Sequence, residues 1–195
     1  MEWRWVTDMS KGEELENLQA EIRSISEQVQ TEFGSLRADQ LNWKPAPASW
    51  SVAQCLDHLI TSNKGYFPIL ETVLAGQKKT SVLERVPILP KVWSKALISS
   101  LDPKTGRNLK APAAFQPSSS ELPDSIIQDF VSNQRRVDDA MASVKNLNIK
   151  QIIITSPAAS FVTYSLLDAF RIIVVHEQRH FQQAMRVKAN ANFPN

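Results

Sequence analysis

The sequence is poor in cysteine. Cys55 is its one cysteine among 195 residues, and a single thiol cannot form an intramolecular disulfide. Secreted scaffolds held together by disulfides are therefore excluded, and a reducing compartment is expected. The first residues lack the apolar segment and the small-residue cleavage site of a secretory signal peptide. Together these absences predict a cytoplasmic protein.

Long apolar runs and a dominant charge are also missing. The longest apolar candidate, residues 170–175 (FRIIVV), is far shorter than the about 20 residues that cross a bilayer. The 22 basic and 20 acidic residues leave a net charge of +2, with no dense basic run. Such a balance is too weak for a surface that binds nucleic acid. We expect neither a membrane nor a nucleic-acid partner.

Glycine is scarce, with five glycines against eleven prolines, which indicates long regular segments joined by proline-marked loops. The length suits one sizeable core, so residues 1–195 are expected to form a single domain. Four segments show apolar residues three or four apart, the period of a helix with one buried face. They cover about residues 11–33, 51–76, 122–147 and 163–188.

Local signals place the ends of these helices. Ser51 and Gln54 form a capping-box pattern that begins the second helix, and Gly76 is a plausible stop. Pro68 lies inside this span and predicts a kink there. Pro123 suits the first turn of the third helix, with capping serines at 118–120.

The connections predict the topology. About forty-five residues separate the second and third helices and about fifteen separate the others, which favours an all-α, up-down-down-up four-helix bundle with one long crossover. Apolar residues at 92–97 predict a short helix within that crossover, residues 77–120. Residues 148–154 have strand character, but no partner strand is evident, so they are expected to form an extended loop.

The three histidines are the most informative residues. His176 and His180 are four apart in HEQRH, which places them about 40° apart around a helix and one turn apart along it. His58 lies seven residues after the Ser51 cap, and His180 lies eight residues before Lys188. If these two helices are antiparallel, all three rings lie at a similar depth. The pattern predicts a metal site in the core of the bundle.

Other interpretations of these residues stay open. In one interpretation, the three histidines are ordinary core residues that bind no metal. HEQRH also matches the HExxH pattern of zinc peptidases, with Glu177 as general base, but no strand edge is evident to hold a peptide. Glu177 is instead expected to face solvent or to bond to a ligand residue. Cys55 is either a small hydrophobe, a fourth ligand or a redox-sensitive neighbour, and Trp43 and Trp50 are expected to pack rather than stack.

Two blocks of the sequence resemble the DinB-like superfamily. Residues 41–59 (LNWKPAPASWSVAQCLDHL) join a Trp-x-Pro turn, a Trp-Ser helix cap and a histidine. Residues 163–185 contain the His-x-x-x-His pair, followed three residues on by Gln183. The resemblance implies a DinB/YfiT-like bundle, often a homodimer, in which three histidines hold zinc, nickel or a similar divalent ion. Characterised relatives include thiol-S-transferases that use bacillithiol or mycothiol, and a mycothiol-dependent maleylpyruvate isomerase.

Three neutral imidazoles would leave open positions on a divalent ion, which is typical of a catalytic site. Such an ion activates a bound water, or binds a low-molecular-weight thiol as thiolate. Gln183 is expected to hydrogen-bond to a ligand histidine. The sequence therefore predicts a metal-dependent enzyme of the thiol-S-transferase or hydrolase type that acts on a small molecule. The alternative is a non-catalytic bundle that binds a metal or a small ligand.

Overall fold

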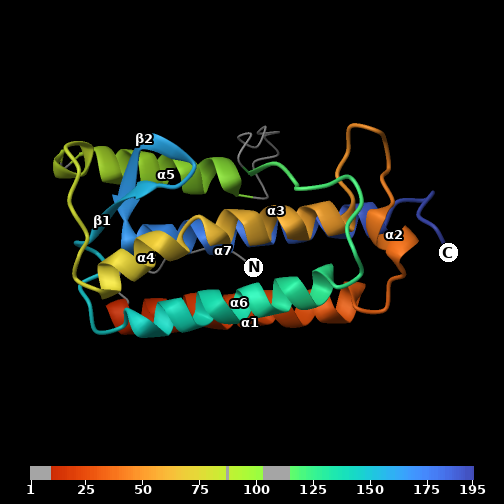
Figure 1. Cartoon of the computed structure of the whole chain (residues 1–195), viewed down its shortest axis with the longest axis horizontal. Coiled ribbons are helices and arrows are strands. Elements are labelled where there is room, and N and C mark those ends of the chain that lie inside the picture. Colours follow the sequence, from red (N-terminus) through yellow and green to blue (C-terminus); the bar gives the residue numbers. More distant parts are fainter. Residues whose placement is uncertain (1–9, 87, 103–114) are drawn as a thin grey trace.

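The computed structural model describes residues 10–86, 88–102 and 115–195. This part of the chain is mostly helical, with one small two-stranded sheet (Figure 1). The helices are α1 (Lys11–Phe33), α2 (Ala38–Asn42), α3 (Val52–Lys64), α4 (Phe67–Leu74), η1 (Leu83–Arg85), α5 (Leu89–Leu101), α6 (Ile126–Ser143) and α7 (Leu166–Lys188); the strands are β1 (Ile153–Ser156) and β2 (Ala159–Ser165). None of these helices is long and apolar enough to cross a membrane.

Helices α1, α3, α6 and α7 lie side by side along the long axis of the molecule (Figure 1). Both α1 and α3 pack against both α6 and α7. In Figure 1, α1 and α7 run in one direction along this axis, and α3 and α6 run in the other. The periodic apolar residues of α1 are all buried, as their spacing predicts: Leu15, Leu18, Ile22, Ile25, Val29 and Phe33.

Side-chain caps begin both helices that carry the site, and the cap of α3 is the predicted one. Ser51 accepts a hydrogen bond from the Gln54 backbone and the Gln54 side chain reaches back to the Ser51 backbone, which starts α3. Ser165 caps α7 by accepting from the Asp168 backbone. These caps set the start of the helix that carries His58 and of the helix that carries the other two histidines.

The second predicted helix is divided in two. It ends at Lys64, and α4 begins at Phe67 with Pro68 in its first turn. The prediction of one kinked helix was wrong because proline has no N–H with which to bond the carbonyl of the preceding turn, and its φ suits a helix start. Gly76 has φ +64, the left-handed conformation that follows many helix ends.

The prediction of an extended loop at 148–154 holds for 148–152 but was wrong for its last two residues, which begin strand β1. The fold is therefore mostly helical rather than purely helical. Strand β1 pairs antiparallel with β2, with Ile153 opposite Ser165 and Thr155 opposite Thr163. The partner strand occupies residues that the helical pattern assigned to the loop and to the start of the fourth helix. That helix begins three residues later than predicted, at Leu166, and α6 is likewise shorter than predicted.

The crossover does contain the predicted helix, α5, which packs against β2 and α7. Beneath it, the buried core forms two apolar clusters. Along α7, Val174 belongs to one cluster and Phe181 to the other. The histidines of α7 therefore lie where the apolar core is interrupted.

Candidate metal centre

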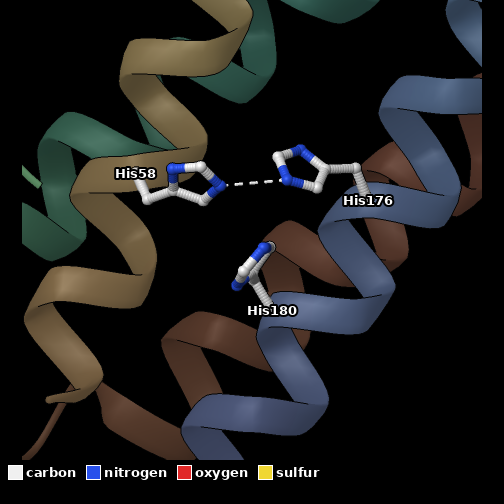
Figure 2. Close-up of side chains that lie close together, drawn as sticks. All are labelled: His58, His176 and His180. Atoms are coloured by element: carbon white, nitrogen blue, oxygen red, sulfur yellow. Dashed lines mark hydrogen bonds between the residues drawn. The ribbon is translucent and has the colours of Figure 1, made fainter. Parts of the chain in front are cut away.

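The structure brings the three histidines together. His58 extends from α3, and His176 and His180 extend from adjacent turns of α7, toward one another (Figure 2). One nitrogen of each ring lies within 4.8 Å of one nitrogen of both others, so that the group could hold a metal ion. The ring centroids are 4.5 Å apart for His58 and His180 and 4.9 Å apart for His58 and His176.

His58 is oriented by the end of the crossover. Its Nδ1 lies 2.5 Å from the backbone oxygen of Phe115, and its Nε2 lies 3.0 Å from Nε2 of His176. A carbonyl only accepts, so Nδ1 carries the hydrogen, and Nε2 of the neutral ring offers a lone pair. Two nitrogens bound to one tetrahedral zinc are about 3.3 Å apart at bond lengths of about 2.0–2.1 Å. The observed spacing is close to that value.

His180 adds a buried nitrogen that needs a partner. No residue in the described part of the chain hydrogen-bonds to its Nδ1. Buried polar atoms are normally satisfied, so an atom left without a partner calls for a ligand or ion that the chain does not supply. The residues present thus fit a bound cation.

The electrostatics keep the cluster neutral. Removal from water lowers the pKa of His58, and it lowers that of His176 well below its ordinary value, with the two other histidines adding to the effect. The pKa of His180 falls to about 3. Burial is the largest cause and the charges of His58 and Arg179 add to it, whereas a hydrogen bond with Gln183 raises this pKa. Neutral imidazoles with free lone pairs are the form that binds a metal.

The cluster lies in the wall of a cavity of about 290 Å³. Helices α3, α5 and α7, the turn between β1 and β2, and the end of the crossover contribute to the wall. Ser62, one turn beyond His58, lines it. Arg179 is the one charged side chain among the described lining residues. The wall is otherwise largely apolar: Leu97, Leu101, Phe115, Pro157, Ala158, Ile172 and Ile173 contribute to it.

The sequence of this chain matches one known protein family. Residues 16–184 match the model of the DinB superfamily. The chain belongs to the DinB superfamily. No significant match was found among curated proteins or among solved structures.

In this DinB protein, Trp50 contacts the histidine cluster. Its indole stacks on the His180 ring, with centroids 5.5 Å apart and an interplanar angle of 25°, and it lies 4.8 Å from the His58 ring. The expectation that Trp50 only packs was wrong, because α7, distant in sequence, brings His180 under it. Trp43 packs edge-on against Phe193, in agreement with its expected role.

Glu177 does not face solvent, so that part of the prediction was wrong. It is fully buried, and its Oε1 accepts hydrogen bonds from Asn63 and Gln134. Burial raises its pKa to about 7, and these two amides only partly oppose the shift. Sequence reasoning missed this network. Its signal was the polar Asn63 and Gln134 within otherwise apolar helical stripes.

Cys55 is a buried core residue. It is 0% exposed and packs within the apolar cluster that also contains Phe181. Desolvation raises the pKa of its thiol to about 12, and the group of atoms that could hold a metal does not include its sulfur. The structure therefore supports the small hydrophobe rather than a fourth ligand or a redox-sensitive neighbour.

Proposed function

We propose that this DinB protein is a divalent-metal-dependent enzyme of the thiol-S-transferase or hydrolase type that acts on a small molecule. His58, His176 and His180 are the proposed ligands, and zinc or nickel is the proposed metal. The observation that carries the proposal is the convergence of three neutral imidazoles, one nitrogen from each within 4.8 Å of the others, in the wall of a cavity.

The proposed architecture is one domain, an up-down-down-up bundle of α1, α3, α6 and α7. The packing of both α1 and α3 against α6 and α7 supports it, as do the helix directions in Figure 1. Superfamily membership alone supports three further proposals: a low-molecular-weight thiol as co-substrate, a homodimer and a cytoplasmic location.

A divalent ion held by three neutral histidines supplies a Lewis acid that lowers the pKa of a water or thiol near it. The chain's own contribution is positioning. The Phe115 carbonyl keeps the hydrogen of His58 on Nδ1, so that Nε2 is presented to the site. Trp50 covers two of the three rings, and the rest of the cavity wall is largely apolar.

The cavity wall offers no carboxylate base. Among its described lining residues there is no carboxylate, and Glu177 is held in a buried amide network on α7. Hydrolysis releases a proton from water, and thiol transfer releases one from the thiol. A divalent ion would lower the pKa of either group, so that solvent could accept the proton, and both reactions stay within the proposal. The missing carboxylate favours the second candidate, a non-catalytic protein that binds a metal or a small ligand.

Elemental analysis tests the ligand assignment. We expect the purified protein, after addition of zinc or nickel and dialysis, to retain about one equivalent of metal. His176→Ala should retain less than a tenth of an equivalent. Gln178→Ala, on the same helix and bonded to Glu21, is the matched control and should retain the metal. Full occupancy in His176→Ala would falsify the assignment.

A turnover assay separates the two functional candidates. The enzyme should consume a thiol such as bacillithiol in the presence of an electrophile, and only when metal is bound. Metal binding that raises the melting temperature without any thiol consumption or hydrolysis supports the non-catalytic alternative.

A further inference from the structure

Two tyrosines form a buried hydroxyl pair in the wall of the cavity. Tyr66, at the junction of α3 and α4, and Tyr164, near the end of β2, have their hydroxyl oxygens 2.8 Å apart. They are 8% and 0% exposed, and both line the cavity that contains the histidines. Tyr66 lies eight residues beyond His58, roughly 12 Å along the helix direction at about 1.5 Å per residue. The backbone of Tyr66 is therefore about two helical turns from that of His58.

Ser156 extends this pair into a set of three hydroxyls. It also lines the cavity, its side chain lies near the Tyr164 hydroxyl, and its oxygen accepts from the Ala158 backbone. No other partner for the hydroxyls of Tyr66, Tyr164 and Ser156 is found among the described residues. Desolvation raises the pKa of both phenols, so all three hydroxyls keep their hydrogens at neutral pH.

The hydroxyl set has more hydrogens than its internal hydrogen bonds use. The two phenols carry two hydrogens, and the contact between them uses one, whichever way that bond points. One phenol hydrogen always remains, on Tyr66 or Tyr164, beside the hydroxyl of Ser156. A buried O–H without an acceptor is costly. The hydroxyl set is therefore ready to donate one hydrogen bond to a molecule in the cavity.

The rest of the cavity limits what that molecule can be. The cavity that contains both the hydroxyls and the imidazoles has a largely apolar wall, with Leu97, Leu101 and Ile172 among its residues. Its volume of about 290 Å³ is typical of a pocket for a small molecule. Its one charged lining residue among those described, Arg179, is on the same turn of α7 as His180. Among the described residues, no cation lines the cavity beside the hydroxyl set to hold an anionic group.

We propose that the hydroxyls of Tyr66, Tyr164 and Ser156 form a subsite for an uncharged, largely apolar small molecule that carries an acceptor oxygen of the carbonyl type. That oxygen accepts the spare hydroxyl hydrogen, and the apolar body extends toward the imidazoles. This assignment of a substrate class rests on the function proposed above, because it takes the histidine cluster as the reaction site. The subsite itself needs no metal.

Three probes of nearly equal shape test the subsite. Acetophenone carries the carbonyl oxygen, α-methylstyrene replaces it with a methylene group, and benzoate adds a charge. Their dissociation constants are measured by NMR titration of the full chain, metal-free and zinc-loaded. The test variant is Tyr66→Phe/Tyr164→Phe. Replacing both partners of a buried hydrogen bond by apolar groups of the same shape costs little stability, and an unchanged melting temperature confirms folding.

We expect the double variant to bind acetophenone about three- to tenfold more weakly than the unsubstituted chain, as loss of one hydrogen bond predicts. The affinity of the double variant for α-methylstyrene should be unchanged or higher. Of the three probes, benzoate should bind the unsubstituted chain most weakly. Thr163→Val, which removes a neighbouring buried hydroxyl that does not line the cavity, is the control and should leave the affinities unchanged.

Equal effects of the double variant on acetophenone and α-methylstyrene would overturn the subsite, as would tighter binding of benzoate than of acetophenone to the metal-free chain or no binding of acetophenone. The metal-free arm separates this outcome from failure of the proposed function. A selective loss of acetophenone affinity in metal-free protein supports the subsite even if the histidines bind no metal. Retained metal with no such selectivity overturns the subsite alone.

Discussion

The indole of Trp50 is stacked on the imidazole of His180, with their centroids 5.5 Å apart and their planes 25° from parallel. Trp50 is therefore a reporter of the histidine cluster. Nickel, a paramagnetic ion, should quench tryptophan emission when it binds there. We expect Trp50→Phe to lose most of this quenching in a fluorescence titration, whereas Trp43→Phe, which alters a ring packed on Phe193, should keep it. Equal quenching in the two variants would place the metal elsewhere.

Zinc affinity should resist acid. Protons compete with a metal only below the pKa values of its ligands in the folded protein. Those of all three histidines are lowered from 6.5, and that of His180 falls to about 3. We expect zinc affinity, measured by competition with a chelator of known pH dependence, to be constant from pH 8 to 6.5 and to fall only at lower pH. A midpoint at or above pH 6.5 would contradict these lowered pKa values.

The same shifts predict how the histidines affect the stability of metal-free protein. A histidine with a lowered folded pKa binds fewer protons when folded than when unfolded. Its contribution to the free energy of unfolding is therefore fully present above pH 6.5 and is lost as the pH falls from 6.5 toward the folded pKa. Urea unfolding of metal-free protein between pH 7 and 5 should show stability falling with acidity, and less so in His180→Gln.

Glu177 should act in the opposite direction. Its pKa rises from 4.5 to about 7 on folding, so the folded state binds the extra proton between these values. The destabilisation caused by its ionisation therefore grows as the pH rises from 4.5 to 7. We expect Glu177→Gln to be more stable than the unsubstituted metal-free chain above pH 7, by on the order of 3 kcal/mol, and to lose this advantage near pH 4.5. Glu27→Gln, on the exposed face of α1, controls for the charge change, and a pH-independent difference would contradict the prediction.

Cys55 should be inert. Its thiol is fully buried, with a pKa raised to about 12, so almost no thiolate forms at pH 8. In folded protein we expect no reaction with iodoacetamide over hours and complete reaction in urea, measured by mass spectrometry. Cys55→Ala should keep its metal and lose about 1 kcal/mol of stability, because it removes one buried side-chain atom. Rapid alkylation of the folded chain would contradict this burial.

Local patterns predicted much of the fold. The spacing of Leu15 to Phe33 predicted the buried face of α1, and the Ser51–Gln54 pair predicted the start of α3. Both depend on residues within one or two helical turns, where the backbone geometry is known. Strand β1 was predicted only as an extended loop, because a strand is stabilised by its partner, and residues 159–165 carry no local signal that selects 153–156.

In the candidate site too, local features were predicted and contacts between distant segments were not. The one-turn separation of His176 and His180 is a local property of α7, and matching the depth of His58 needed only helix lengths and an antiparallel order. Trp50, Asn63 and Gln134 were assigned no part in the site, since their contacts with His180 and Glu177 join different helices.

The sequence by itself determined the approximate positions of the four long helices, the one-turn separation of two histidines and the absence of a second cysteine. These follow from side-chain chemistry and from a helical repeat that is the same in every protein. Only the tertiary structure decided that a backbone oxygen at Phe115 sets the tautomer of His58, and that Tyr66 and Tyr164 share one cavity with the histidines. Such contacts depend on how helices and strands distant in sequence pack together, which no local pattern contains.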